Sequence, residues 1–208
     1  RGQYGLAPVK ITLPEGTPVK MMAAILASAL PNFDPAAFTA AALPWEGYLF
    51  PDTYFFQTTA TPTKVIKSLR DNFQQKIKSL EPLIAGSGRT LEQVIIMASL
   101  LEEEAASSEA RRIIAGILWK RLDVGMPLQI DAIFPYIIDK NSFELDGDDL
   151  ATSSPYNTYR FRGLPAGPIT NPGFDAIEAA LNPIATDYWY YLSDRAGRLH
   201  YAVDFDQH

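Results

Sequence analysis

The 208-residue sequence predicts an α+β fold that is rich in helix and carries small β-sheet and hairpin elements. Three observations lead to this class. Long segments show helical periodicity behind helix-start signals. Short segments with strand-like alternation occur near both ends of the chain. Helical and extended segments do not alternate regularly, which favours α+β.

The first part of the chain is expected to hold one strand and two helices before an aromatic segment. Residues 9–13 (VKITL) alternate as a strand does. Thr17 is the expected N-cap, and Pro18 the first residue, of a helix that includes MMAAILASAL. A second short helix is expected within residues 31–43. Trp45 to Phe56 (WEGYLFPDTYFF) is expected to form strand and turn, because glycine and proline interrupt its periodicity.

The rest of the chain is expected to be mainly helical. Thr61–Pro62 repeats the helix-start signal, and Thr90 and Gln93 have the spacing of a capping box. In order, we expect a helix over 62–80, a loop at 86–88, a helix from 91 that carries three glutamates, a helix over 109–122 that ends near residue 125, a polar turn region at 141–150, a structured loop at 153–172, a short helix over 173–181, and a hairpin within 187–203 whose turn lies at 194–197.

Composition narrows the classes of function. The net charge is −6 and the sequence pI is about 4.9. No basic stripe runs along the chain, so nucleic acid is not an expected partner. The absence of cysteine excludes disulfides, thiolate metal sites and a cysteine nucleophile. No apolar run is long enough to span a bilayer. Because the chain begins at Arg1 without a signal peptide, we expect a piece of a longer protein with an anchor or targeting segment upstream.

The glutamates Glu102, Glu103 and Glu104 end an otherwise apolar helix. At about 100° per residue, one face of this helix is an apolar stripe that consists of Val94, Ala98, Leu101 and Ala105. Glu103 points away from this stripe, and Glu102 and Glu104 fall on its two flanks. A half-buried carboxyl loses hydration, which raises its pKa and keeps a general acid protonated near neutral pH. The alternative is a solvated helix end without chemistry. Helix geometry does not choose between Glu102 and Glu104.

A stiff loop carries side chains suited to sugar binding. Tyr156, Asn157 and Tyr159 lie in PYNTY, ahead of GLPAGPITNPG, which contains Asn171. A tyrosine ring can pack on a pyranose, and an amide can bond its hydroxyl and acetamido groups. Proline and glycine fix the loop, so that binding costs less entropy. The alternative is a rigid connection whose aromatic side chains only pack.

Two other segments offer polar side chains. Gln129 and Asp131 in LQIDA lie two apart, so in an extended segment they face the same way and could orient a catalytic carboxyl or a substrate. Alternatively, Asp131 caps a helix. In WEGYLFPDTYFF the aromatic side chains could line a groove with Glu46 and Asp52 as polar partners, although for most of them core packing is the favoured interpretation.

No metal or cofactor is expected. ELDGDDL has acidic spacing faintly like that of a calcium loop, but it lacks the full pattern and the terminal bidentate glutamate, so a solvated turn is expected. The chain has no zinc motif, glycine-rich phosphate loop or nucleophile elbow.

Five segments occur in an order that resembles one family: EGYLFPDTY, MASLLEEEA, AGILWKRLDVGMPLQIDA, SPYNTYRFRGLPAGPITNPG and ALNPIATDYWYYLSD. Together they resemble MltG-type endolytic lytic transglycosylases, also called YceG-like proteins, over residues 45–208. Such enzymes cut bacterial peptidoglycan strands between MurNAc and GlcNAc without water. The muramyl 6-hydroxyl attacks and leaves a 1,6-anhydro end. The resemblance therefore implies a lyase that terminates nascent glycan strands and uses no cofactor.

The resemblance also implies roles for single residues. The family's Glu-Lys-Glu motif falls on residues 102–104, which makes Glu104 the catalytic acid and Glu102 a neighbour that shapes the site. Glu103 replaces the usual lysine, and its negative charge is expected to raise the pKa of its neighbours. The residues then expected to bind substrate are Gln129, Asp131, Tyr156, Asn157, Tyr159, Asn171 and Glu46.

For the whole protein, the resemblance implies a membrane-anchored enzyme. Residues 1–44 would be the end of a LysM-like region with linking helices, and residues 45–208 the catalytic domain. A membrane helix upstream would anchor the protein in the inner membrane with this domain outside the cytoplasm. Peptidoglycan strands are the expected substrate, and penicillin-binding proteins and other cell-wall synthesis proteins the expected partners. Two alternatives stay open: a hydrolytic muramidase, in which Glu102 or Asp131 activates water, and a non-catalytic glycan-binding scaffold.

Overall fold

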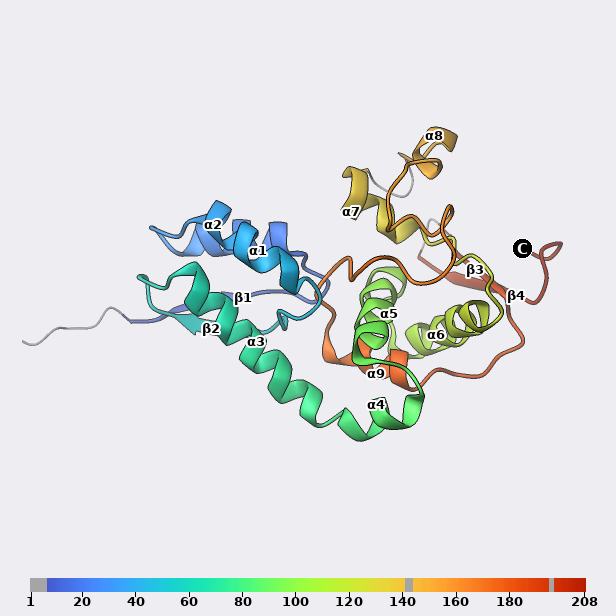
Figure 1. The fold of residues 1–208 in the computed structure, drawn as a ribbon, viewed down its shortest axis with the longest axis horizontal. Helices are drawn as coiled ribbons and strands as arrows, with labels where there is room; N and C mark the ends of the chain where they lie inside the picture. The colour runs from blue at the N-terminus through green and yellow to red at the C-terminus, as the bar shows by residue number, and fades with distance from the viewer. Residues whose placement is uncertain (1–6, 141–143, 195–196) are drawn as a thin grey trace, which may run out of the picture.

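The computed structural model describes residues 7–140, 144–194 and 197–208 (Figure 1). Its elements follow in the order β1 (Val9–Thr12), α1 (Val19–Ala29), α2 (Pro35–Ala42), η1 (Leu43–Trp45), β2 (Thr53–Phe56), α3 (Pro62–Lys78), α4 (Glu81–Ser87), α5 (Leu91–Glu104), α6 (Ser108–Asp123), η2 (Asp131–Ile133), α7 (Phe134–Ile138), α8 (Gly147–Leu150), α9 (Phe174–Leu181), β3 (Tyr190–Ser193) and β4 (Leu199–Ala202). The described strands form two antiparallel pairs, β1 with β2 and β3 with β4. The predicted α+β class is confirmed.

An N-terminal unit is built around the β1–β2 pair and the helices α1 and α2. Val9 lies opposite Phe56 in the antiparallel register. Side chains from these elements and from the first half of α3 form one buried cluster that extends from Ile11 to Leu69. This unit lies at one end of the molecule, and most of the remaining helices lie at the other (Figure 1).

The start of α1 differs from the prediction. Its N-cap is Pro18, and the hydroxyl of Thr17 instead donates to the Pro14 carbonyl oxygen at 2.7 Å. The Val19 N–H donates to both carboxylate oxygens of Glu46, each at 3.1 Å. A carboxylate at a helix N-terminus satisfies an otherwise unpaired N–H and lies at the positive end of the helix dipole.

Helix α3 joins the N-terminal unit to the second core (Figure 1). Thr61 caps its first turn, as predicted. Val65 and Leu69 belong to the N-terminal core, whereas Phe73 and Ile77 belong to the second core. The two cores therefore divide within α3. The domain boundary and the LysM-like region implied by the resemblance stay predictions.

Helix α5 lies at the centre of the second core and carries the glutamates at its end. Thr90 and Gln93 form the predicted capping box, with bonds of 3.2 Å and 2.9 Å. Every residue from Val94 to Leu101 is buried. The helix is therefore covered all round, by α6 and α9 among others, and not along one stripe only. Its acidic last turn is where it leaves the core.

Short helices replace some of the expected loops. Helix α4 extends into the predicted loop at 86–88 and ends at Ser87. Gly88 follows as its C-cap with a left-handed φ of 71°, as helix C-termini often require. The alternative of a helix start near Asp131 is confirmed in part: η2 begins at Asp131, but the N-cap position is Ile130 and no side chain caps it. Helix α7 was not predicted, because it is too short to show a period. The loop at 153–172 contains neither helix nor strand, and α9 follows it, as predicted.

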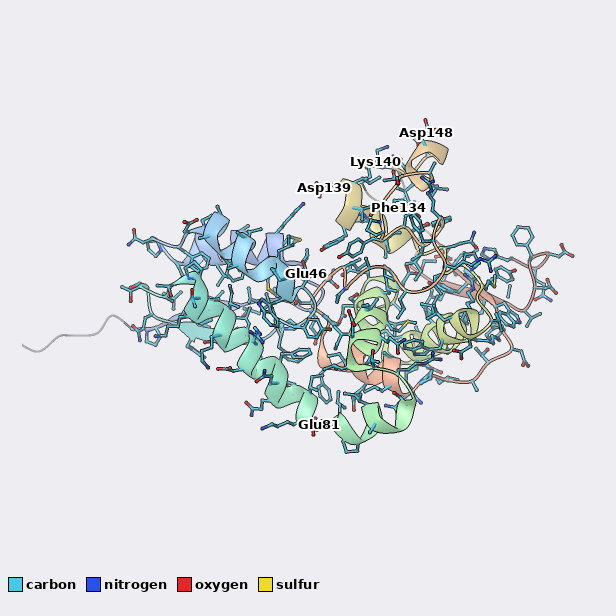
Figure 2. The ribbon with its side chains drawn as sticks, in the orientation of Figure 1. Glu46, Glu81, Phe134, Asp139, Lys140 and Asp148 are labelled. Atoms are coloured by element: carbon cyan, nitrogen blue, oxygen red, sulfur yellow. The ribbon has the colours of Figure 1, made fainter. Side chains whose placement is uncertain are left out.

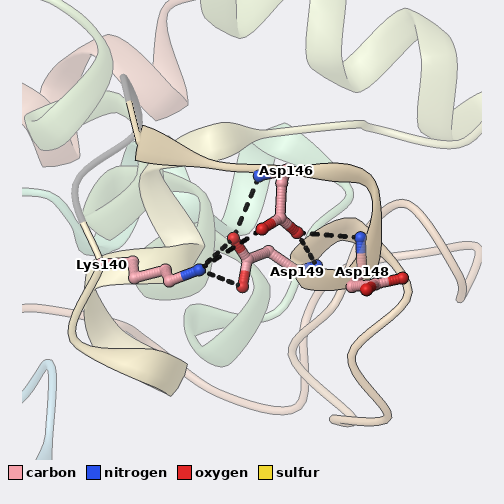
Figure 3. A network of polar contacts seen from close by, with 4 residues as sticks. All are labelled: Lys140, Asp146, Asp148 and Asp149. Atoms are coloured by element: carbon pink, nitrogen blue, oxygen red, sulfur yellow. Dashed lines mark hydrogen bonds and ion pairs between the residues drawn. The ribbon is translucent and has the colours of Figure 1, made fainter.

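The acidic segment around α8 is held by a lysine. The Lys140 ammonium donates to both carboxylate oxygens of Asp149, at 2.8 Å and 2.6 Å, and lies 3.8 Å from Asp146 (Figure 3). Asp146 caps α8 by accepting from the N–H groups of Asp148 and Asp149. The predicted turn region also includes residues 141–143, which lie outside the described part. In the part described, no group of three or more His, Cys, Asp or Glu side chains could hold a metal ion.

The predicted C-terminal hairpin is confirmed. Tyr190 lies opposite Ala202, and Ser193 opposite Leu199. Residues 195–196 of the predicted turn lie outside the described residues. Within the described ranges, the helices are too short or too polar to cross a membrane.

Candidate active site

A cavity of about 530 Å³ opens at the acidic end of α5. Helix α6, the segment around η2, the strand β3 and the C-terminal residues complete its wall. The lining residues are Glu103, Glu104, Arg121, Gln129, Asp131, Ala132, Tyr159, Tyr190, Tyr191, Leu192, Ser193, Phe205 and His208. The structure therefore brings together four of the predicted site residues, namely Glu104, Gln129, Asp131 and Tyr159.

Glu104 places its carboxyl in the wall of this cavity. Burial raises the pKa of Glu104 to about 7, and the negative charges of Asp131 and Glu103 add to the rise. The Tyr191 hydroxyl and the Ala132 backbone N–H donate hydrogen bonds to the carboxyl, and these bonds lower the pKa and so oppose the rise. Near neutral pH the carboxyl therefore exists in both protonated and ionised forms. A group that acts first as an acid and then as a base needs this property.

Gln129, Asp131 and Tyr159 form one wall of the cavity. The Tyr159 hydroxyl donates to the Asp131 carboxylate. Behind them, the Gln129 N–H donates to the Thr158 carbonyl oxygen at 3.3 Å, and the Ile130 N–H to the Thr158 hydroxyl at 3.0 Å. Gln129 and Asp131 face the cavity with Ile130 buried between them, as the spacing predicted. The backbone at Gln129, however, is left-handed, with a φ of 52°, and such strain often marks functional sites.

Glu103 also lines the cavity, which helix geometry alone did not predict. Part of its side chain is exposed, as expected, yet loss of hydration raises the pKa of Glu103 to about 6, with a further contribution from Glu102. Its carboxylate lies against Gly16, where a Cβ atom would come within 2.7 Å of Oε1. The cavity therefore holds three carboxyl groups close together.

Glu102 is built into an ion-pair network and is not a lining residue. Its side chain, only 5% exposed, pairs with Arg111 and accepts the Gly173 N–H at 2.7 Å. Arg111 also binds Asp175 at 2.6 Å. Burial raises the pKa of Glu102, and the Gly173 bond and the Arg111 charge oppose the rise. Helix geometry did not distinguish Glu102 from Glu104, but of these two carboxyl groups only that of Glu104 lines the cavity.

Asn157 holds its own loop together. Its side chain is fully buried. Its amide nitrogen donates to two backbone carbonyl oxygens at 2.9 Å and 2.8 Å, and its amide oxygen accepts the Tyr159 N–H at 2.9 Å. The Tyr156 ring packs on the Tyr136 ring, with centroids 5.1 Å apart. This geometry supports the rigid-loop alternative for both residues, and their contact with a sugar stays a prediction.

Glu46 lies between the N-terminal unit and the second core (Figure 2), and its carboxylate there accepts a hydrogen bond from Asn171. Asn171 is fully buried and its amide is saturated: Oδ1 accepts the N–H groups of Gly47 and Leu49 at 2.9 Å and 3.0 Å, and Nδ2 donates to Glu46 at 2.7 Å and to the Thr17 carbonyl oxygen at 3.0 Å. Burial raises the pKa of Glu46 to about 7. Neither residue lines the cavity, and their buried internal bonds indicate a structural role; the predicted substrate contact stays a prediction.

Comparison with known proteins decides the family. A model described as the YceG-like family matches residues 2–208. The chain belongs to the YceG-like family. It is 36% identical over 166 residues to the endolytic murein transglycosylase of Bacillus subtilis strain 168. The alignment covers 79% of this chain and 46% of that protein. It is 33% identical over 169 residues to the endolytic murein transglycosylase of Streptococcus pneumoniae serotype 2. That alignment covers 78% of this chain and 31% of the relative.

This YceG-like chain spans less than half the length of those two relatives. A solved structure of a yceG-like protein from Listeria monocytogenes has the same fold, with a TM-score of 0.87 and 27% sequence identity. The match covers 97% of this chain and 75% of that chain.

Two residues that line the cavity of this YceG-like chain, Tyr191 and Arg121, were not among the predicted site residues, because the periodicity of the sequence does not distinguish them. Tyr191 lies in β3, where one face of a short hairpin strand meets the end of α5. Arg121 lies in the last turn of α6 and is 5% exposed. Both belong to segments whose motifs carry the family resemblance, ALNPIATDYWYYLSD and AGILWKRLDVGMPLQIDA, and this is the sequence signal that could have singled them out.

Proposed function

We propose that this chain carries the catalytic part of an endolytic lytic transglycosylase. It would cleave the bond between MurNAc and GlcNAc in peptidoglycan strands and leave 1,6-anhydro-MurNAc ends. The observation that carries the proposal is Glu104, a carboxyl with a pKa near 7 in the wall of a cavity large enough for sugars. The relatives that bear the name endolytic murein transglycosylase support the substrate.

In this proposal Glu104 serves first as the acid and then as the base. Protonated, it gives its proton to the glycosidic oxygen as the bond to the muramyl anomeric carbon breaks. The carboxylate then takes the proton of the muramyl 6-hydroxyl as that oxygen bonds to the anomeric carbon. The Tyr191 hydroxyl and the Ala132 N–H stabilise the intermediate carboxylate. Most glycoside hydrolases need two carboxylates, and an internal nucleophile removes that need.

Asp131 would act on the same step through its charge. Its carboxylate is fixed by the Tyr159 hydroxyl, and its negative charge favours the protonated form of Glu104. The same charge would stabilise the positive charge that develops on the sugar ring as the bond breaks. Gln129, also exposed to the cavity, would bind the sugar.

We assign positioning roles to the remaining predicted residues. Glu102, tied to Arg111 and the Gly173 N–H, would hold the last turn of α5 so that Glu104 points into the cavity. Asn157 would hold the loop that presents Tyr159. Asn171 would fix the junction from which the Gly173 segment starts.

Cleavage of purified glycan strands tests the proposal. Glu104→Gln keeps the size of the side chain and removes the proton, so we expect the rate to fall by about 10²- to 10⁴-fold. Glu92→Gln, at an exposed glutamate in the first turn of the same helix, should leave the rate unchanged. Unchanged cleavage by Glu104→Gln would remove Glu104 from the mechanism.

A hydrolytic muramidase is the second candidate, and one observation favours it. Asp131 lines the same cavity as Glu104 and could activate a water molecule. Glu102, the other group considered for that role, is held by Arg111 away from the cavity. The products separate the two mechanisms, because hydrolysis leaves a reducing MurNAc end and the transglycosylase reaction leaves an anhydro end.

We further propose that the whole protein works in the bacterial cell envelope. Action on peptidoglycan requires the catalytic part to lie outside the cytoplasm. An inner-membrane anchor upstream, and contact with penicillin-binding proteins and other cell-wall synthesis proteins during strand termination, are implied by the resemblance. Fractionation of cells that express the full-length protein tests the anchor, and cross-linking in those cells tests the partners.

A further inference from the structure

Arg121 is a buried cation in the wall of the candidate active site. Only 5% of the residue is exposed. Two of its N–H groups are used internally: Nε donates to the Trp189 carbonyl oxygen at 2.7 Å, and Nη1 to the Leu128 carbonyl oxygen at 2.8 Å. These bonds fix the guanidinium between α6, the start of β3 and the segment that leads to Gln129.

The charge of Arg121 has no acidic partner among the described residues. None of the ion pairs found in that part of the chain includes it, and its Nη2 donates no hydrogen bond there. The Tyr190 ring, 5.1 Å from the guanidinium carbon, offsets part of the cost of burial. A buried arginine is nevertheless rare unless it is paired. Burial accordingly lowers the pKa of Arg121.

The free nitrogen opens on the cavity. Nη2 is not one of the enclosed, unsatisfied atoms of the structure, and Arg121 lines the cavity that contains Glu104. A guanidinium can donate five hydrogen bonds in a fixed plane. With two donors committed to backbone carbonyls, the arrangement presents a ready donor to whatever occupies the cavity.

The charges around the cavity select the kind of acceptor. Glu103, Glu104 and Asp131 line it together with Arg121 and His208, so the three carboxyl groups outnumber the one arginine and the one histidine. An anionic ligand group would be repelled by at least one carboxylate. A neutral oxygen with strong acceptor character, such as an amide carbonyl, meets no such repulsion and still gains a charge-assisted bond.

We propose that Arg121 binds the carbonyl oxygen of an acylamino group on the sugar in the cavity. Arg121 is then a substrate-binding residue that selects N-acylated sugars. This inference rests on the proposed function, because it takes a glycan as the ligand.

The test weakens the acceptor on the substrate. Glycan strands are chemically N-deacetylated and then re-acylated, one portion with acetyl and one with trifluoroacetyl groups, whose carbonyl is a poorer acceptor of similar shape. We expect the wild type to show a kcat/KM about tenfold lower on the trifluoroacetyl strands, as for a weakened bond to a charged donor. Arg121→Gln should show a difference of less than about twofold. Arg112→Gln, an exposed arginine of the same helix with one bond to a carbonyl oxygen, should behave as the wild type.

A binding measurement with the wild type decides the matter even if Arg121→Gln does not fold. Calorimetry compares the Kd of a GlcNAc–MurNAc disaccharide in its N-acetyl and N-trifluoroacetyl forms, where no bond is cleaved and inductive effects on cleavage play no part. A Kd about tenfold weaker for the trifluoroacetyl form supports the proposal. Equal affinity, or binding of neither form, overturns it, as does equal discrimination by the wild type and a folded Arg121→Gln. Failure of the proposed function shows itself separately, as absence of cleavage of the natural strands.

Discussion

The hydroxyl of Tyr191, on β3, donates a hydrogen bond to the carboxyl of Glu104, at the end of α5. The C-terminal hairpin brings these two residues together across most of the second half of the chain. The bond favours the carboxylate, whereas burial and the charge of Asp131 favour the protonated acid. Because these influences act on one proton, the pH dependence of activity reports on each of them.

Tyr191→Phe should move the high-pH limb of kcat/KM to higher pH. The hydroxyl lowers the pKa of Glu104, so its removal raises that pKa and keeps the acid protonated over a wider range. The maximal rate should fall by about tenfold, because the intermediate carboxylate loses one donor. A pH–rate profile on glycan strands measures both effects. A limb that stays in place would show that the hydroxyl does not act on the Glu104 proton.

Asp131→Asn should move the same limb in the opposite direction. Removal of the negative charge lowers the pKa of Glu104, so the acid is lost at lower pH. The asparagine oxygen can still accept the Tyr159 hydroxyl, which preserves the wall of the cavity. The same pH–rate assay measures the change, with Tyr191→Phe as its counterpart. Shifts of the same sign in both variants would contradict the assignment of these two causes.

Glu46→Gln should make stability less dependent on pH. The pKa of Glu46 is raised by burial from 4.5 to about 7. The folded state therefore prefers the protonated form, and this contribution is fully present below pH 4.5 and is lost as the pH rises through 7. Between pH 4.5 and 7 the free energy of unfolding of the wild type should fall by on the order of 3 kcal/mol more than that of the variant. Urea unfolding at several pH values measures the difference, and parallel curves would show that Glu46 does not titrate in this way.

Asn171→Ala should destabilise the protein strongly. The substitution removes the buried partner of the Gly47 and Leu49 N–H groups and of the Thr17 carbonyl oxygen. It also removes one of the two donors to Oε1 of Glu46, which keeps the Val19 N–H. Unsatisfied buried groups cost about 1–3 kcal/mol each, so we expect a loss of about 3 kcal/mol or more. Asn182→Ala is the matched control, because the Asn182 side chain makes one exposed bond at the end of α9, and the substitution should cost less than about 1 kcal/mol. Similar losses in the two variants would argue against the junction as a stabilising feature.

The parts of the fold that the sequence predicts correctly are those with a local signal. The helix starts at Thr61 and Thr90 were predicted because a cap and its bonds lie within one turn. Gln129 and Asp131 both line the cavity as predicted, but not through the extended segment that their spacing assumed, because Gln129 is left-handed and Asp131 begins η2. The short helices α4 and α7 were missed, because segments of that length show no clear period.

The site itself depends on contacts between distant segments. Glu102 and Glu104 occupy equivalent flanks of one helix, and only Arg111 and Gly173, from other elements, distinguish them. Asn157 and Asn171 have a residue type suited to sugars, but tertiary burial commits both to internal bonds. Tyr191 and Arg121 enter the cavity through the packing of β3 and α6, which no local pattern encodes. The family resemblance, not periodicity, selected Glu104.

Cleavage in water enriched in oxygen-18 tests the central claim most directly. Glycan strands are incubated with the wild type in the labelled water, and the new muramyl ends are measured by mass spectrometry. Internal attack by the 6-hydroxyl adds no water, so we expect 1,6-anhydro ends that carry no label. New reducing muramyl ends that contain oxygen-18 would contradict the account and establish hydrolysis.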